Sequence, residues 1–246
     1  MKFGIDLGHG VDPDRGVVGV INEEDIINEV GVMVINKLRM LGHCVVELRP
    51  TSASSVSNSL WQRYTKANNN NVDLCVSIHA NAGGGRGTEI FTYRGREVKE
   101  ARNVLDNIVS LGFSNRGIKD GSNLAMIKNT VAVAMLIEIC FVDSSDSDLY
   151  NQIGAEEIAD AIVLGLTGHV INEKKYYVVT NYLKGAYEGY DGVDIKSIIN
   201  SYFSDVKCYV RGNEKGVWIE TQYLPKLKCE QLKLALGSLF YEIVED

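Results

Sequence analysis

Two histidines and two glutamates are the residues of this chain best suited to chemistry, namely His9, Glu24, His79 and Glu138. Two neutral imidazoles and one carboxylate are a common ligand set for a catalytic zinc ion, which keeps a fourth position open for water. Glu138 follows four apolar residues, where a carboxylate is costly unless it is paired or ligated. It is therefore the candidate general base, which would take a proton from water that the metal has acidified to a pKa of about 7.

The sequence around these residues predicts elements that bring them together. An apolar segment at 3–7 predicts a strand that ends just before His9, and the run that ends at His79 predicts a strand covered on both faces. Apolar residues at helical spacing predict a helix over 24–41, with Glu24 in its first turn. A buried strand is predicted over 131–139, with Glu138 near its end. Because parallel strands end at one edge of a sheet, the four side chains should converge there.

The rest of the N-terminal part continues this alternation of strands and helices. Further strands are predicted over 43–48 and 88–93, the second as an edge strand, and further helices over 54–68, 97–111 and 147–166. Between 112 and 130 the sequence predicts irregular structure. We therefore expect an α/β fold, a mostly parallel twisted sheet with helices on both faces.

A second, smaller unit is predicted at the C-terminal end. Residues 169–175 are polar and indicate a linker after a first domain at 1–168. Residues 176–246 then follow the order strand, helix, strand, strand, helix, strand. This βαββαβ order predicts a small ferredoxin-like α+β module.

Composition excludes several classes of function. The formal net charge of −7 argues against nucleic acid as a partner, because such binding depends on Lys and Arg. No apolar run reaches the ~18 residues of a membrane span, and the N-terminus lacks an apolar signal segment, which favours the cytoplasm as the place of folding. Five cysteines without a CxxC pair indicate reduced core residues rather than disulfides.

Four short motifs follow one another along residues 1–168: Gly8-His9-Gly10, the helix start Glu24–Asn28, Ser77–Asn81 and Leu136–Phe141. Together they resemble the successive motifs of the zinc-dependent N-acetylmuramoyl-L-alanine amidases of the amidase-3 family. The resemblance implies that one zinc ion is bound by three of the residues above and that Glu138 is the catalytic carboxylate. It implies hydrolysis of the amide that joins the lactyl group of N-acetylmuramic acid to L-alanine of the peptidoglycan stem peptide.

The resemblance assigns the zinc ligands to His9, Glu24 and His79. Glu23 adjoins Glu24 and stays an alternative; Glu24 is preferred because Asn28 follows it by four residues, as in the family pattern. The sequence departs from the family at Leu7, where members often have proline, and this change affects no ligand.

Two further residues are candidates for contact with the substrate. Asn81 follows His79 closely, and Arg63 lies on the predicted helix 54–68. Arg63 is equally well explained as a surface charge on an amphipathic helix.

An amidase without a signal segment and with a separate C-terminal module resembles a bacteriophage endolysin. Such a protein is held in the host cytoplasm before lysis and then acts on bacterial peptidoglycan. The module at 176–246 would be a cell-wall-binding domain, somewhat similar to sporulation-related repeats, in which Tyr187, Tyr190 and Trp218 are candidates for stacking on sugars. Packing within the module explains these aromatic residues equally well.

Two other functions remain open from the sequence. A zinc carboxypeptidase acting on the stem peptide is the first, although such enzymes place a glutamate three residues after the first histidine, where this chain has Asp12. A non-catalytic wall-binding protein with an amidase fold is the second. The sequence does not distinguish a phage enzyme from a bacterial autolysin or spore-wall enzyme, and it predicts no oligomeric state.

Overall fold

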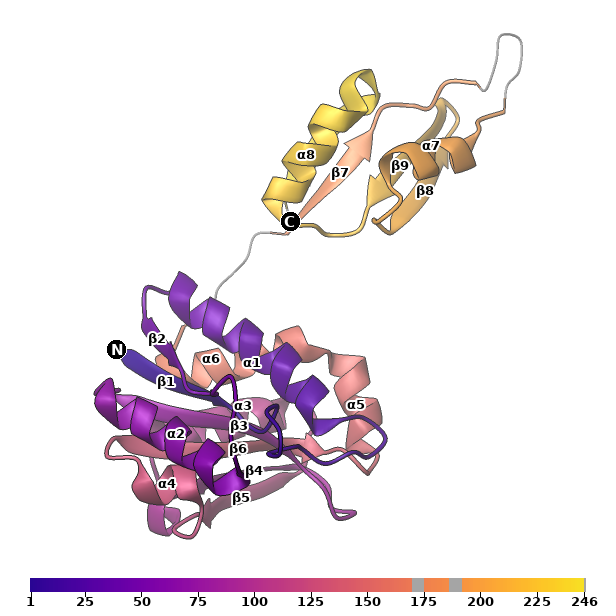
Figure 1. Cartoon of the computed structure of the whole chain (residues 1–246). Helices are drawn as coiled ribbons and strands as arrows, with labels where there is room; N and C mark the ends of the chain where they lie inside the picture. The colour runs from indigo at the N-terminus through magenta and orange to yellow at the C-terminus, as the bar shows by residue number, and fades with distance from the viewer. Residues whose placement is uncertain (170–174, 186–191, 246) are drawn as a thin grey trace. The chain divides into compact units, whose positions relative to one another are not determined.

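The computed structural model describes residues 1–169, 175–185 and 192–245 (Figure 1). The chain forms two compact units, Met1–Ile171 and Asn172–Asp246, and each is described by itself. The predicted linker, 169–175, lies largely outside the described residues, so the predicted domain limits stay a prediction.

The first unit is built on a six-stranded sheet in the order β2-β1-β3-β6-β4-β5. Its strands are β1 (Lys2–Leu7), β2 (Cys44–Glu47), β3 (Leu74–Asn81), β4 (Thr88–Thr92), β5 (Asn115–Asp120) and β6 (Val133–Phe141). Neighbouring strands run parallel except β4 and β6, which are antiparallel. The prediction of a mostly parallel α/β sheet is confirmed.

Two details of the predicted sheet were wrong, namely the place of β4 and the absence of a strand between 112 and 130. The strand predicted at an edge, β4, lies between β6 and β5, and β5 forms the edge instead. The sequence of β5, Asn-Arg-Gly-Ile-Lys-Asp, has almost no apolar residues, and none of its residues is buried. An exposed edge strand does not need an apolar face, so its sequence carried no alternating signal.

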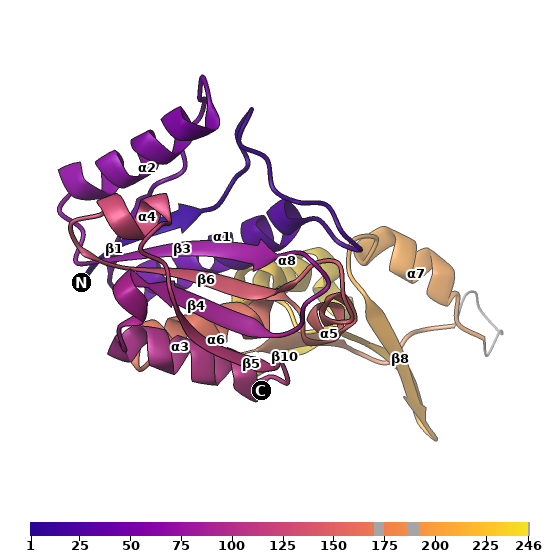
Figure 2. The same cartoon turned by 90° about the horizontal axis from the view of Figure 1, so that it is seen from below.

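Helices cover both faces of this sheet, as Figures 1 and 2 show. The helices are α1 (Glu23–Met40), α2 (Val56–Asn69), α3 (Lys99–Ser110), α4 (Ala125–Asn129), α5 (Asp146–Ile153) and α6 (Ala155–Thr167), with a short 3-10 turn at Tyr93–Gly95. In Figure 2, α2 and α4 lie on one side of the sheet and α3 and α6 on the other. The single helix predicted at 147–166 is two helices, because Gly154 adopts a positive φ of 89° between them.

Alternate residues of each central strand point to opposite faces of the sheet. In β3, Leu74, Val76 and Ile78 belong to the larger core, which includes the side chains of α1, α3 and α6. Cys75 belongs instead to the smaller core, which also contains side chains of α2 and α4. Ser77 and His79 alternate with the residues of the larger core in the same way as Cys75. Their side chains therefore lie on the face of the sheet that α2 covers.

The second unit contains β7 (Tyr176–Thr180), α7 (Ile195–Tyr202), β8 (Cys208–Asn213), β9 (Gly216–Thr221), α8 (Lys226–Leu236), a 3-10 turn (Gly237–Leu239) and β10 (Phe240–Glu245). Its four strands form an antiparallel sheet in the order β10-β7-β9-β8. This is the predicted βαββαβ arrangement.

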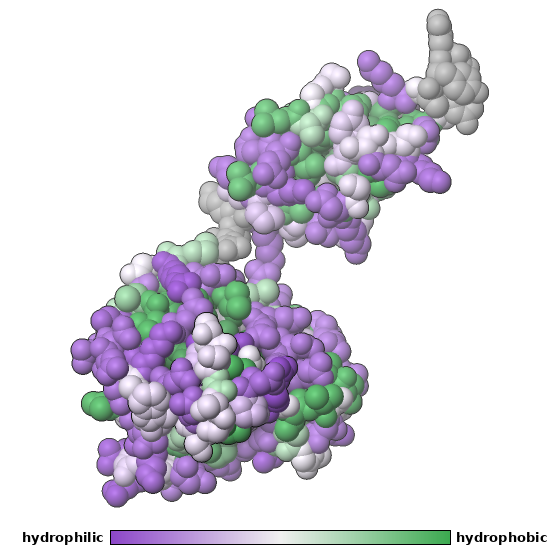
Figure 3. Space-filling view, viewed as in Figure 1, coloured by the Kyte–Doolittle hydropathy of each residue, from purple (hydrophilic) through white to green (hydrophobic). Residues whose placement is uncertain are grey.

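On the face shown in Figure 3, hydrophilic side chains predominate on the first unit, whereas hydrophilic and hydrophobic side chains are interspersed on the second. Within the described ranges, every helix is too short or too polar to cross a membrane.

Candidate metal centre and active site

Three side chains converge at the carboxyl end of the sheet, and one of them is not the predicted one. His9, Glu23 and His79 each offer a ligand atom within 4.8 Å of the others. Oε1 of Glu23 lies 3.1 Å from Nδ1 of His79 and 3.6 Å from Nε2 of His9. The two imidazole rings stand edge to face with centroids 4.9 Å apart.

The two histidines meet because β1 and β3 are parallel neighbours, with Leu7 opposite Ile78. The chain then passes through Gly8, whose backbone lies directly against the ring of His79. A Cβ at Gly8 would lie 2.3 Å from Cε1 of His79, so only glycine permits this approach. His9 follows with a φ of 51°, which turns its side chain toward the end of β3.

Glu23 is the first residue of α1 and is only 3% exposed. Its carboxylate accepts backbone hydrogen bonds from Val17 at 3.0 Å and from Ala80 at 3.3 Å. Burial by itself raises the pKa of Glu23, but the hydrogen bond with His79 and the backbone of Val17 outweigh it and lower the pKa. The group is therefore ionised at neutral pH, which metal binding requires.

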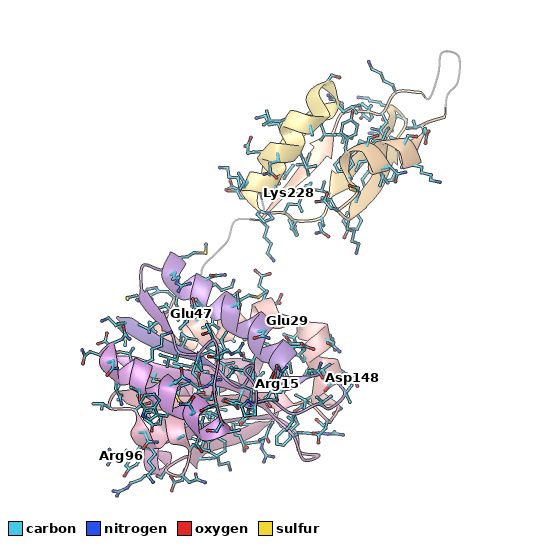
Figure 4. All side chains as sticks on the ribbon, viewed as in Figure 1. Arg15, Glu29, Glu47, Arg96, Asp148 and Lys228 are labelled. Atoms are coloured by element: carbon cyan, nitrogen blue, oxygen red, sulfur yellow. The ribbon has the colours of Figure 1, made fainter. Side chains whose placement is uncertain are left out.

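Glu24, the predicted ligand, points away from this centre. Both of its oxygens accept hydrogen bonds from the guanidinium of Arg15 at 2.8 Å, and Gly16 donates to it at 2.9 Å. Arg15 is labelled in Figure 4, beside the N-terminal end of α1. Successive residues of a helix are rotated by about 100°, so two adjacent glutamates cannot face the same ion.

Asn28, whose spacing favoured Glu24, also lies away from the histidines. Its Oδ1 accepts a hydrogen bond of 2.7 Å from Arg49, which also donates to the carbonyl oxygens of Leu7 and Gly8. Asn28 therefore helps to hold the loop before His9. The structure thus places Glu23, and not the expected Glu24, beside the two histidines.

Asp14 orients His9 and was missed by the sequence analysis. Its Oδ1 lies 2.8 Å from Nδ1 of His9, which leaves Nε2 directed at Glu23. Ser59 donates a hydrogen bond of 2.6 Å to the other oxygen of Asp14. Burial raises the pKa of Asp14, but hydrogen bonds from Ser59 and His9 lower it overall. Asp14 lies in a loop without periodicity, so only its contact with His9 reveals it.

Arg63 is buried beneath the centre, with an exposure of 1%. It donates hydrogen bonds of 2.6 Å to Asp6 and to the carbonyl of Leu7, and one of 2.7 Å to the carbonyl of His9. Both expectations for Arg63, a substrate contact and a surface charge, disagree with this burial. The arginine holds the end of β1 in place.

Glu138 lies on β6 beside His79 on the neighbouring strand. Within the described part of the chain, its Oε2 atom is buried and has no hydrogen-bond partner. Burial raises the pKa of Glu138 to about 7, and the nearby charges of Glu23 and Glu89 contribute, while His79 opposes the rise. A carboxyl group with such a pKa can accept and return a proton near neutral pH.

Asn81 ends β3, two residues beyond His79. Its side-chain amide donates a hydrogen bond of 3.0 Å to Glu89, and its Oδ1 accepts one of 2.8 Å from the backbone of Ala82. Asn81 thus lies near the site but is engaged with protein groups. A contact with substrate stays a prediction.

The separations of the two histidine nitrogens from Glu23 are compatible with a zinc ion. Bonds of about 2.0–2.2 Å in a tetrahedral site separate neighbouring ligand atoms by about 3.3–3.6 Å. The separations of 3.1 and 3.6 Å around Glu23 are close to this range. The hydrogen bond between His9 and Asp14 is the outer carboxylate contact common behind a histidine ligand.

Comparison with known proteins identifies the family. The sequence model of one family, described as N-acetylmuramoyl-L-alanine amidase, matches residues 4–168. The chain belongs to this amidase family.

The matched region of this chain resembles both bacterial and phage proteins. An uncharacterized protein of Clostridium perfringens is 30% identical over 184 residues, which are 71% of this chain and 52% of the relative. The endolysin of Bacillus phage SPP1 is 31% identical over 151 residues, which are 58% of this chain and 55% of that protein. The chain thus spans about half the length of these curated relatives.

A solved structure supports the same fold. The catalytic domain of the CD27L endolysin, which targets Clostridia Difficile, superposes with a TM-score of 0.62 at 26% sequence identity. The match covers 70% of this chain and 99% of the solved domain.

Proposed function

We propose that this protein is a zinc-dependent amidase that hydrolyses the bond between N-acetylmuramic acid and L-alanine in peptidoglycan. The observation that carries the proposal is the cluster of His9, Glu23 and His79 with Glu138 one strand away, whose buried Oε2 has no hydrogen-bond partner among the described residues. Membership of the amidase family supports the choice of substrate.

Each residue has a definite task in this proposal. His9, Glu23 and His79 hold the zinc ion, which when bound supplies Lewis-acid chemistry that acidifies water and polarises the scissile carbonyl. Asp14 keeps Nε2 of His9 available for binding. Glu138 accepts the proton of the attacking water and returns it to the amine of L-alanine as the C–N bond breaks.

The second unit is proposed to bind the cell wall. Helices α7 and α8 pack on one face of its sheet, and the other face carries Tyr177 and Trp218 beside a cavity of about 430 Å³. Aromatic rings with nearby polar groups are suited to sugars, because they combine apolar contact with hydrogen bonding. Tyr187 and Tyr190 lie outside the described residues.

A lytic role for phage release is part of the same proposal. The likeness to two endolysins favours it. Such an enzyme would be held in the host cytoplasm until lysis, and it would act on peptidoglycan rather than on nucleic acid or membrane.

The deciding experiment measures metal content and wall digestion together. Purified protein is expected to contain one zinc ion per chain, to lose activity on chelation and to regain it with zinc. Mass spectrometry should find new L-alanine amino termini in the digested wall. Release of a C-terminal amino acid would instead support a carboxypeptidase, and zinc binding without any cleavage would support a non-catalytic wall-binding protein.

A further inference from the structure

A row of ionisable side chains crosses the sheet from the metal centre toward its edge. In the strand registers, His79 on β3 is opposite Glu138 on β6, and Glu138 is opposite Glu89 on β4. These three residues therefore share one face of the sheet. Arg116, on the edge strand β5, continues this row. The proposed mechanism assigns no role to Arg116.

The position of Arg116 depends on an irregularity in β5. Asn115 pairs with Thr88 and Gly117 pairs with Glu89, so Arg116 is an extra residue between two successive pairs. Such a bulge re-aims a side chain, and bulges are frequent beside active sites. Gly117 has a φ of 86°, a left-handed conformation that glycine adopts readily.

The guanidinium of Arg116 is held from one side. Its Nε atom donates a hydrogen bond of 2.8 Å to Glu89, whose other oxygen accepts the hydrogen bond from Asn81. Its Cζ atom lies 4.8 Å from the centre of the Phe141 ring. Glu89 is buried, whereas 37% of the Arg116 side chain is exposed.

The other side of the guanidinium remains available. Nη1 makes only a long contact of 3.5 Å with the carbonyl of Arg86, and Nη2 has no hydrogen-bond partner among the described residues. An arginine fixed at Nε and open at its two terminal nitrogens presents the fork that binds a carboxylate with two hydrogen bonds.

We propose that Arg116 binds a free carboxylate of the stem peptide and so makes the enzyme select walls in which that carboxylate is not amidated. This inference rests on the proposed amidase function. The lactyl carboxyl of N-acetylmuramic acid is consumed in the scissile amide, so the free carboxylates of the substrate belong to the stem peptide. Arg116 is therefore a specificity residue on the leaving-group side.

The spacing of the strands agrees with this assignment. Neighbouring strands are about 4.8 Å apart, so the backbone at Arg116 lies two spacings, about 10 Å, from that at Glu138. Two to three residues of an extended peptide span about 7–10 Å. A carboxylate within the first residues of the stem peptide can thus reach Arg116 while the scissile amide lies beside Glu138.

The experiment compares two substrates with the zinc-loaded full chain. Purified peptidoglycan is used as isolated and after its carboxylates are converted to methylamides with methylamine and a carbodiimide. The rate of formation of new L-alanine amino termini is measured at low substrate concentration. The wild-type protein should act about tenfold faster on the free-carboxylate wall, as expected for a charge-assisted hydrogen bond of about 1.5 kcal/mol.

Variants assign the preference to one residue. Arg116→Gln should bring the ratio of the two rates close to one, and Arg116→Lys should give an intermediate ratio, because lysine keeps the charge but not the fork. Arg96→Gln removes the same charge from an exposed position after β4 and should keep the wild-type ratio. Arg96 is labelled in Figure 4. Both substrates are tested with one preparation, so partial unfolding of a variant cancels in the ratio.

Three results would overturn the inference. Equal rates of the wild-type protein on both walls would show that no carboxylate is recognised. An unchanged preference in Arg116→Gln would place the recognition elsewhere, including the second unit. Zinc-loaded protein that forms no L-alanine termini from either wall would remove the proposed function, and the inference with it.

Discussion

At the scale of single residues, the proposed metal centre depends on which atoms are held in place before an ion binds. Glu23 is fixed by two backbone donors, and His9 is fixed by Asp14. Glu138 is different, because its buried Oε2 is left without a partner in the described part of the chain. A ligand should be rigid, whereas a proton carrier needs a free oxygen.

The two adjacent glutamates of α1 provide a matched pair of variants. Glu23→Gln should weaken zinc binding by more than the 10–100-fold typical of losing an outer contact, because it removes a ligand itself. Glu24→Gln loses only the exposed pairing with Arg15 and should retain zinc. Metal content after dialysis against graded chelator measures both. Zinc loss in Glu24→Gln with retention in Glu23→Gln would reverse the assignment.

Replacing the proposed general base should separate catalysis from metal binding. Glu138→Gln is expected to keep one zinc ion per chain and to lower kcat by about 10²–10⁴-fold, the usual contribution of general acid–base catalysis. Release of L-alanine amino termini gives the rate, and metal analysis gives the control. A variant that cleaves wall at the normal rate would exclude Glu138 from proton transfer.

The cysteines should differ strongly in reactivity. Burial raises the pKa of Cys75 and of Cys140 to about 12, from an ordinary value of 9.0. Because only the thiolate reacts, this higher pKa lowers the thiolate fraction at pH 8 by about 1000-fold. Cys44 is exposed, contrary to the expected core position, and should react first. A thiol reagent followed by mass spectrometry tests this order, which rapid labelling of Cys75 in folded protein would contradict.

At the scale of elements, a buried ion pair joins α2 to the strands beneath the site. Arg63 of α2 pairs with Asp6 of β1, and Ser77 of β3 donates to the other oxygen of Asp6 at 2.6 Å. Helix α2 and the strands β1 and β3 are thus connected close to His9 and His79. Breaking such a pair leaves a buried charge without compensation.

Removal of this arginine should therefore affect stability strongly. Arg63→Leu is expected to lower the free energy of unfolding by about 3–5 kcal/mol, because Asp6 stays buried and unpaired. Arg39→Leu breaks an exposed pair with Glu47 and should cost less than about 1 kcal/mol. Urea denaturation of metal-free protein measures both values. Similar losses in the two variants would mean that the buried network contributes little.

At the scale of the whole molecule, the chain carries two units with separate cores. The proposed metal centre belongs entirely to the first unit, and the aromatic sheet face belongs to the second. Cleavage and wall attachment should therefore respond to different substitutions.

The two tryptophans of the chain test this separation. Trp218→Ala should weaken co-sedimentation with purified wall about 3–10-fold, the effect of losing one aromatic contact of about 0.5–1.5 kcal/mol, while cleavage of soluble wall fragments stays unchanged. Trp61→Ala alters an exposed tryptophan of the first unit and should leave wall binding unchanged. Equal effects on binding would argue against the second unit as the attachment site.

Much of the fold could be predicted because the signals are local. Apolar runs and helical spacing placed the strands around His9, His79 and Glu138, and the order of elements indicated both sheets. An exposed segment such as β5 needs no alternation of apolar and polar residues, so the sequence did not reveal this strand.

Only the tertiary structure decided which side chains surround the histidines. Glu23 and Glu24 are the same residue type at adjacent positions, and the direction in which α1 presents them depends on how the helix packs at the sheet edge. Asp14, Arg63 and Arg116 acquire their places from partners on other elements, such as Asp6, which lies 57 residues before Arg63. A local pattern cannot encode such contacts, because they exist only after the strands have paired.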